Sequence, residues 1–335
     1  IISGGNFWLS SGTGNCTINL AGNLLINGGT LDLANSSGVG TINVGGNVTV
    51  SSGTLTEGGS TTTSKIVFNK SGNQTFTSGG TISNLVNFEV GASSILDLGT
   101  SVLSGGSFTI PSGATLKIAQ ASGISGAITA STKTFSSAAN YEFNGATSGT
   151  FTTTPTANTV NNLTINRSAG VTLNQSFTTT GTLTLTSGTL DIGANTLTIA
   201  GSVSRTNGNI DADAGTVSFT NANDLNLPTS LFSGNIYNIT KVSGAGTVTL
   251  NDNLTVTNEL NSIASIGAFI IPSLKELAVS GTGKATINGT ITNNGTFTLN
   301  SGATLLQGSN SSITGGAYNV KQTITGAGTS TPTGR

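Results

Sequence analysis

Apolar and polar residues alternate in short runs along most of the chain. Residues 17–33 are typical: they read T-I-N-L, then N-L-L-I, then G-T-L-D-L, with Gly or Asn-Gly at the breaks. Alternation with a period of two predicts short strands, because successive side chains of a strand point to opposite faces. Gly and Asn at the breaks favour tight turns. The pattern therefore predicts three short strands joined by turns before it begins again.

The same pattern returns directly afterwards. Residues 41–57 align with 17–33 without a gap (41 − 17 = 24), and 8 of the 17 aligned positions are identical. One such unit cannot bury its own apolar face, whereas stacked units form a continuous core. We therefore expect an all-β chain that folds as a single elongated domain, a right-handed parallel β-helix (β-solenoid) with coils of about 20–25 residues.

A longer repeat of about 76 residues overlies the coils. Phe68, Phe143 and Phe219 begin similar segments at nearly equal spacings (143 − 68 = 75; 219 − 143 = 76). Phe88 belongs to the same repeat and follows Phe68 by about one coil (88 − 68 = 20). Because these aromatic residues recur with the repeat, we expect all of them in the core.

The composition is nearly uniform from end to end, so we expect no linker. The prediction is a continuous solenoid over residues 1–325, with the longer repeat between 64 and 290, and a flexible tail or joining segment at 326–335. Two segments are less regular: 117–140 is rich in Ala and Ser, and 259–277 has the pattern of one short helical turn or a protruding loop.

Charge and composition exclude several function classes. Only 7% of the residues are charged, the net charge is −1, and 35% are hydrophobic, which does not fit the composition of a disordered chain. Eleven Lys and Arg in 335 residues cannot form the basic stripe that nucleic-acid binding requires. No apolar run is long enough to span a membrane. Because there is no His, zinc or haem ligation through His and any Ser-His-Asp or Cys-His chemistry are excluded, and we expect no cofactor.

Location and partners follow from the ends of the sequence and from its few thiols. The chain begins Ile1-Ile2-Ser3, contains no Met and has one Cys, so we expect a processed or excised portion of a secreted, extracellular protein. Both terminal segments read as strands rather than polar caps. The expected partners are therefore the rest of a longer polypeptide, or further copies of the chain, at uncapped ends. Surface glycans and a secretion or anchoring machinery are further candidates.

Three strings resemble a known class of proteins: SGTLDIGANTLTIAG (187–201), VNNLTINRSAGVTLN (160–174) and SKIVFNKSGNQTF (64–76). They look like the repeat regions of large secreted cell-surface proteins of the Bacteroidota, many of which are adhesin-like cargo of the type IX secretion system. The resemblance covers nearly the whole chain and rests on the style of the repeats. It implies export, surface display and an adhesive or structural role, and it carries over no catalytic residue. The sorting domain that usually ends such proteins is not found here.

One local cluster of charged residues is a weak candidate for a catalytic or calcium site. Asp191 and Asp211 are separated by about one coil (211 − 191 = 20), so their side chains could stack, and Asp211 and Asp213 share a face. With Arg205 they resemble the way in which β-helix polysaccharide lyases hold calcium and abstract a proton. The other interpretation is a solvated acidic edge that aids solubility, and alternation predicts that Asp32, Asp97 and Asp191 all face solvent.

Polar rows on the strands allow a second kind of site. Segments 176–189 and 284–304 place Thr at alternate positions, as in ice-binding solenoids, although Thr also suits any exposed strand face. The spacing of these rows wanders between coils, which argues against a regular ice-binding array. Asn23 and Asn47 are expected to form an internal ladder in which each amide bonds its copy in the next coil.

The sequence favours a non-catalytic function. We expect a structural or adhesive shaft of a secreted bacterial cell-surface protein or extracellular filament. The alternatives that stay open are a carbohydrate-active, polysaccharide lyase-like enzyme that uses the aspartate cluster, and a glycan- or ice-binding module.

Overall fold

Strands pair in parallel with strands one coil further along the chain. Cys16–Leu20 (β2) lies beside Gly40–Val44 (β4), with Ile18 opposite Ile42 and Asn19 opposite Asn43. The offset between partners (42 − 18 = 24) is the period expected from the sequence. The computed structural model describes the chain except residues 61–62, 84, 152–157, 263–267, 309–310, 321–323, 327–328 and 332–335.

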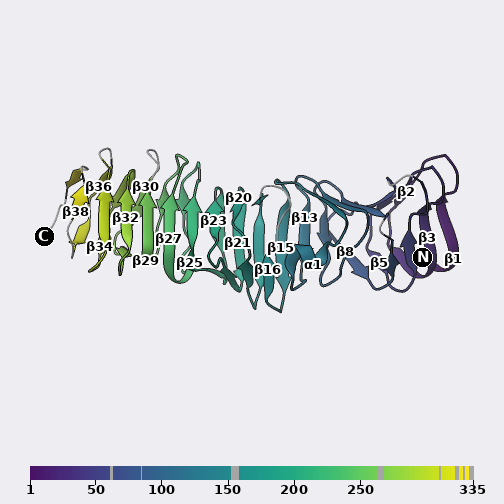
Figure 1. Cartoon of the computed structure of the whole chain (residues 1–335), viewed down its shortest axis with the longest axis horizontal. Helices are drawn as coiled ribbons and strands as arrows, with labels where there is room; N and C mark the ends of the chain where they lie inside the picture. The colour runs from purple at the N-terminus through teal and green to yellow at the C-terminus, as the bar shows by residue number, and fades with distance from the viewer. Residues whose placement is uncertain are drawn as a thin grey trace. The chain divides into compact units, whose positions relative to one another are not determined.

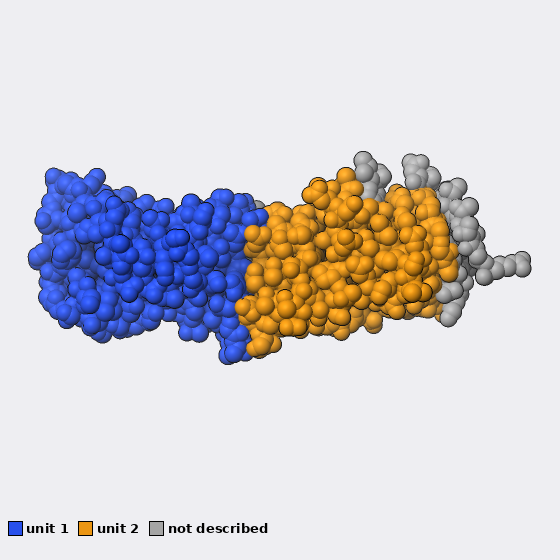
Figure 2. Space-filling model, turned by 180° about the vertical axis from the view of Figure 1, so that it is seen from behind, with its two compact units in different colours: residues 1–161 blue, residues 162–335 orange. Residues whose placement is uncertain are grey.

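The chain divides into two compact units, residues 1–161 and 162–335, which have different colours in Figure 2. Over the described residues the chain is 56% strand and 2% helix, and the parallel sheets stack as a β-solenoid of about 13 turns. Figure 1 shows the strands of successive coils side by side. The expected parallel β-solenoid is therefore confirmed.

In the first unit the coils have three faces. The first face is one parallel sheet, in the order β14 (Thr132–Phe135), β12 (Ser107–Ile110), β10 (Asn87–Val90), β7 (Lys65–Phe68), β4 and β2. The second face contains β15 (Asn140–Gly145), β13 (Thr115–Ile118), β11 (Ile95–Asp97), β8 (Asn73–Ser78), β5 (Val48–Val50) and the first half of β3 (Leu24–Ala34). The third face contains the second half of β3, β6 (Thr54–Thr56) and β9 (Thr81–Ile82). β1 (Ile2–Ser10) pairs with β3, and β16 (Gly149–Phe151) and β17 (Thr159–Val160) follow in the chain.

The second unit also has three faces. One contains β20 (Phe177–Thr179), β23 (Thr196–Ile199), the second halves of β25 (Asn209–Phe219), β27 (Phe232–Lys241) and β29 (Leu254–Ser262), then β32 (Lys284–Ile287), β35 (Thr304–Gln307) and β38 (Ile324–Gly326). Another contains β19 (Val171–Leu173), β22 (Thr189–Asp191), the first halves of β25, β27 and β29, then β31 (Glu276–Val279), β34 (Thr296–Leu299) and β37 (Ala317–Val320).

The remaining face of the second unit is split between two sheets. The first ends in β18 (Leu163–Arg167), β21 (Thr182–Ser187) and β24 (Ser202–Arg205). The second contains β26 (Leu225–Asn226), β28 (Val248–Thr249), β30 (Ala268–Ile271), β33 (Thr290–Asn293), β36 (Ser312–Thr314) and β39 (Thr329–Thr331). β24 and β26 are end strands and do not pair with each other, so the ladder on this face is interrupted between them.

The core is the inside of the coils, where inward positions stack from one coil to the next. Leu31 and Leu55 lie opposite each other and are almost fully buried. The four recurring aromatic residues Phe68, Phe88, Phe143 and Phe219 are buried as well, which confirms their expected place in the core. Phe68 and Phe88 stack with ring centroids 6.0 Å apart on the first face.

Phe68 and Phe143 align in the 76-residue repeat, but they lie on different faces of the coils. Phe68 ends β7 on the first face of the first unit, whereas Phe143 lies in β15 on the second face. Both side chains are fully buried, so the core accepts a Phe on either face.

The expectation that Asp32 faces solvent is wrong. Asp32 is only 7% exposed, although its neighbours Leu31 and Leu33 point inward as alternation predicts. The next coil covers it: the backbone N–H of Gly58 donates to Asp32 Oδ1 at 2.9 Å, and a Cβ on Gly58 would lie 3.0 Å from the other carboxylate oxygen. The carboxylate therefore holds the turn after β6. Asp97 and Asp191 are half-buried.

The asparagine ladder uses backbone donors as well as side chains. The backbone N–H of Asn47 donates to Asn23 Oδ1 at 2.8 Å, and Thr75 N–H donates to Asn47 Oδ1 at 3.1 Å. Asn43 Nδ2 donates to Asn19 Oδ1 at 2.7 Å, which is the bond between stacked amides that we expected of a ladder. Each of these bonds joins two coils, so the amides help to fix the stacking, at turns for Asn23 and Asn47 and within the β2–β4 pair for Asn19 and Asn43.

The irregular segments have different outcomes. The helix of the described residues, α1 (Gly123–Ala127), lies within 117–140 rather than within 259–277. Part of the expected loop at 259–277, residues 263–267, lies outside the described residues. So do 327–328 and 332–335 of the expected tail, whereas Thr329–Thr331 forms β39. Among the described residues no helix is long and apolar enough to cross a membrane.

Candidate functional site

The aspartate cluster lies on the face of the second unit that contains β22 and the first half of β25. Asp191 and Asp211 are opposite each other in adjacent strands, as their spacing in the sequence suggested, and Thr172 occupies the same position one coil earlier. Asp213 lies two residues beyond Asp211 and is exposed. The three aspartates therefore lie on neighbouring outward positions.

Their carboxylates bind neighbouring groups of the chain. Asp191 Oδ1 accepts a hydrogen bond from Gly193 N–H at 2.8 Å, and Asp191 Oδ2 accepts one from Thr172 Oγ1 at 3.4 Å. Asp211 Oδ1 accepts from Asp213 N–H at 3.3 Å. These are local contacts of turns and adjacent coils, of the kind that Asp often makes with its own backbone.

Arg205 is not part of this arrangement. It ends β24, in a different sheet, and lies opposite the buried Leu185. Its Nε is buried without a hydrogen-bond partner, and within the described ranges the arginine forms no ion pair with any of the three aspartates. No three His, Cys, Asp or Glu side chains among the described residues gather closely enough to hold a metal ion.

A hydroxyl row follows the face of the second unit that contains β20 and β23. Thr178, Thr198, Ser218 and Thr240 lie in register on four successive coils, and Asn261 follows them. The coils change length outside this row, at turns and at the register shifts within β25, β27 and β29, so the wandering sequence spacing does not break the row. Beside it, a hollow of about 120 Å³ is bordered by Asn238 and Glu259, and it is too small for an ordinary ligand.

A larger pocket lies at a corner of the second unit, where the ladder between β24 and β26 is interrupted. We call it the corner pocket. Its cause is a change in turn length: Ala200–Gly201 joins β23 to β24 in two residues, whereas the turn at 220–224 joins β25 to β26 in five. The longer turn carries the chain away from the previous coil and leaves a hollow of about 460 Å³ between them.

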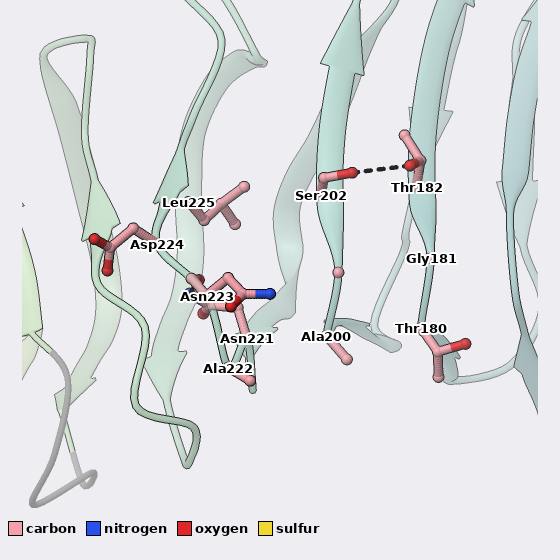
Figure 3. A pocket seen from close by; sticks show the side chains of 11 residues that line it. Thr180, Gly181, Thr182, Ala200, Ser202, Asn221, Ala222, Asn223, Asp224 and Leu225 are labelled. Carbon is pink, nitrogen blue, oxygen red and sulfur yellow. Dashed lines mark hydrogen bonds between the residues drawn. The ribbon is translucent and has the colours of Figure 1, made fainter.

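The lining of the corner pocket is mixed, with hydroxyl, amide and carboxylate side chains beside Ala200, Ala222 and Leu225. Thr182 and Ser202 lie on one side, with their hydroxyl oxygens 2.8 Å apart, and Asn223 and Asp224 lie on the other (Figure 3). Asp224 is the one charged residue of this lining. Its Oδ1 accepts hydrogen bonds from the Thr247 N–H at 2.8 Å and from the Thr247 hydroxyl at 2.9 Å. These bonds, the backbone bond above all, lower the pKa of Asp224 below its ordinary value.

The floor of the pocket is held by the next coil. Asn221 is 1% exposed, and its Nδ2 donates to the carbonyl oxygens of Asn223 at 2.7 Å and Thr247 at 3.0 Å. Gly246 lies so close that a Cβ there would be 2.0 Å from the Asn223 carbonyl oxygen. The hydrogen bonds of Asn221 and the close approach of Gly246 therefore hold the five-residue turn against the next coil, and a residue larger than Gly would not fit at position 246.

Two buried cations lie in the same unit. Arg167 and Lys241 are fully buried, and burial lowers the pKa of each. Lys241 Nζ donates to the carbonyl oxygens of Ser243 and Gly244 in the turn that follows β27. Lys241 thus anchors the turn that packs beneath the corner pocket.

The sequence did not predict the corner pocket: Thr180 and Thr182 belong to the candidate Thr segment 176–189, but the residues at 200–202 and 221–225 were not candidates. The signal for them was present as an insertion: LTIAGSV (197–203) and VSFTNANDLNL (217–227) align through the strand and differ in the turn that follows it. No protein-family model matches the chain, and neither the curated proteins nor the solved structures give a significant match. Function must therefore be argued from the residues themselves.

Proposed function

We propose that the chain is a non-catalytic structural and adhesive shaft segment of a secreted bacterial cell-surface protein or extracellular filament. The observation that carries the proposal is the coil-to-coil stacking within each unit. Apolar side chains such as Leu31 and Leu55 fill the inside in register, and outward positions are mostly Thr, Ser and Asn. Such a stack is extended by adding coils, which is what a spacer needs.

The few charged residues of the surface also support a structural role. Lys117 and Glu142 are opposite each other on adjacent coils with Nζ and Oε2 3.0 Å apart, and Lys65 and Glu89 form a second pair at 2.7 Å. Asp32, Asp191 and Asp224 accept backbone hydrogen bonds at turns. These ion pairs therefore connect adjacent coils, and these aspartates stabilise turns. A structural role explains them without any catalytic role.

The repeat strings quoted above support export and surface display, by their resemblance to secreted Bacteroidota proteins. Low charge and a single Cys, Cys16, agree with an extracellular setting. A polysaccharide lyase-like enzyme is the second candidate, and the in-register pair Asp191 and Asp211 is the observation that favours it.

The test is to locate the protein and to assay it. Antibodies raised against residues 1–335 are applied to intact cells of the source organism, with immunogold electron microscopy and protease shaving as readouts. We expect surface label that protease removes, and no cleavage of acidic polysaccharides by the purified chain with or without calcium. Label confined to the cytosolic fraction contradicts surface display. Release of unsaturated uronides that is lost in Asp211→Ala would favour the enzyme instead.

A further inference from the structure

We propose that the corner pocket binds a short neutral oligosaccharide, with the Thr182–Ser202 hydroxyl pair and the Asn223 amide as its principal hydrogen-bonding groups. The inference goes beyond the shaft function and does not depend on it. It rests on the size, the charge and the hydrogen-bonding groups of the pocket, and on the held turn that forms one of its walls.

Size separates this pocket from the smaller hollow of the same unit. Its volume of about 460 Å³ lies within the range of small-molecule sites, roughly 300–1,000 Å³. The hollow beside Asn238 has only about 120 Å³. The corner pocket is also open to solvent along the exposed residues Ser202 and Asn223, so a ligand of several rings can enter from the side and extend beyond it.

Charge decides against an anionic ligand. Asp224 is the one charged residue of the lining, and Lys and Arg are absent from it. The bonds from Thr247 keep this carboxylate ionised well into the acidic range. A phosphate or uronate would therefore meet a like charge without a compensating cation. A cation would find a single exposed carboxylate, which binds weakly in water.

The available hydrogen-bonding groups fit a polyol. Both Thr247 donors go to Asp224 Oδ1, and the Asp224 carboxylate points toward the next coil, away from Thr182 and Ser202 (Figure 3), so Asp224 contributes charge to the pocket rather than a hydrogen bond to the ligand. The hydroxyls of Thr182 and Ser202 both donate and accept, and the exposed amide of Asn223 offers two further donors and an acceptor. Adjacent hydroxyls of a sugar ring have the same mixed character. Asn221 also lines the pocket, and its buried Oδ1 has no hydrogen-bond partner.

The turn at 220–224, which forms one wall of the pocket, is held in place before a ligand arrives. The Asn221 amide is bonded on two sides, and Gly246 packs against the Asn223 carbonyl. Few protein groups then lose conformational freedom when a ligand binds, so the entropy cost of binding is small. This partly compensates for the affinity that is lost because the site has no aromatic platform. We expect affinities near the millimolar range, typical of recognition by a few exposed hydrogen bonds.

The test is saturation-transfer NMR on the whole chain with neutral trisaccharides of glucose, galactose, mannose and N-acetylglucosamine. Trigalacturonate and a glucosamine trimer supply the anionic and cationic arms. We expect at least one neutral trisaccharide to bind and the trigalacturonate to bind at least about tenfold more weakly than it. Tighter binding of either charged trimer than of every neutral one would overturn the proposal.

Two pairs of variants locate the binding. Ser202→Phe fills the pocket, whereas Ser204→Phe alters the next exposed position of β24, which does not line it. Asn223→Ala removes the amide from the opposite wall, whereas Asp224→Asn changes the next side chain, which points toward the next coil (Figure 3). We expect Ser202→Phe and Asn223→Ala to weaken binding of the neutral trisaccharide at least about tenfold, and the controls Ser204→Phe and Asp224→Asn to leave it unchanged.

Failure is equally clear. If none of the four neutral trisaccharides gives a saturation-transfer signal at about 10 mM, the pocket is not a sugar site of any useful affinity. Binding that survives Ser202→Phe in a variant with the melting temperature of the parent places the ligand elsewhere. Neither result bears on the shaft function, which the localisation experiment tests separately.

Discussion

Asp191 and Asp211 lie directly opposite each other on adjacent parallel strands, yet each carboxylate accepts a hydrogen bond from the backbone two residues further on. Neighbouring strands are about 4.8 Å apart, so two like charges face the same strip of solvent. Like charges in such positions repel each other unless a cation lies between them. If one charge is removed, stability should rise where the pair is repulsive and fall where a cation is bound between the two carboxylates. The direction of the change in the free energy of unfolding therefore distinguishes the two cases.

Asp211→Asn should raise the free energy of unfolding by about 0.2–1 kcal/mol at low salt, and by less at high salt, because it removes the repulsion. Urea denaturation at two ionic strengths measures this. Asp97→Asn is the matched control: Asp97 also bonds the backbone two residues on, at Gly99, but it lies opposite Lys117. There the same substitution should lower stability slightly.

Calcium should not change the melting temperature, because an ion that binds only the folded state would raise it. Thermal unfolding of the parent chain with calcium and with chelator checks this. A calcium-dependent rise that disappears in Asp211→Asn would establish a metal site at this pair and would reverse the expected sign of the substitution.

The inward and outward positions should respond differently to a buried charge. Leu55→Asp should destabilise the first unit by several kcal/mol, because it buries an uncompensated charge between Leu31 and Ile82. Thr54→Asp, one position earlier and half-buried on the outward side, should cost less than about 0.5 kcal/mol. Equal losses in urea denaturation would mean that the assignment of the two faces is wrong.

Period-two alternation was enough to predict the coil and its core from the sequence. It correctly places Leu31 and Leu55 inside because each strand needs only its own neighbours to define its faces. It fails at Asp32, since the group that covers this side chain, Gly58, belongs to a different coil. Alternation also cannot predict where Arg205 lies relative to Asp191. The two residues are in different sheets, and their separation depends on the turns between those sheets.

The corner pocket could not be predicted for a related reason. Its walls come from three coils, and its volume depends on how the turn at 220–224 leaves β25. A single sequence shows that this turn is longer than Ala200–Gly201, but not whether the extra residues fold over the core or away from it. In the structure the turn leads away from the previous coil. Buried Asn221 holds it there, because its Nδ2 donates to one carbonyl oxygen of the turn and to one of the next coil.

Gly188 should be among the least replaceable residues of the second unit. Its φ is +76°, and a Cβ there would lie 1.8 Å from the Arg167 carbonyl oxygen. Gly193 has a φ of +51° but its nearest neighbour would be 3.8 Å away. Gly193→Ala should therefore cost only the left-handed strain, about 1–2 kcal/mol, whereas Gly188→Ala should cost more because the backbone of two coils must separate. Similar losses for the two variants in urea denaturation would show that the coils separate easily here.

Glu57 makes the stability of the first unit depend on pH. Its side chain is 1% exposed at an inward position, next in alternation after Leu55. Burial raises the pKa of Glu57 above its ordinary value of 4.5; the neighbouring Ser64 partly offsets this, and the nearby Asp32 carboxylate adds to it. Between 4.5 and the raised pKa the folded chain holds a proton that the unfolded chain has lost. The contribution of Glu57 to stability therefore falls as pH rises through this window.

Glu57→Gln keeps the shape of the side chain and removes the titration. The difference in free energy of unfolding, variant minus parent, should grow from pH 4.5 toward neutral pH and then level off above the raised pKa. Urea denaturation at several pH values, followed in the whole chain, gives this difference directly. Glu89→Gln is the control, because Glu89 pairs with Lys65 on the surface and its side chain is 37% exposed, so its difference should stay small throughout. If the Glu57→Gln difference were constant across the same range, Glu57 would have to be ionised in the folded chain, with a cationic partner in the core.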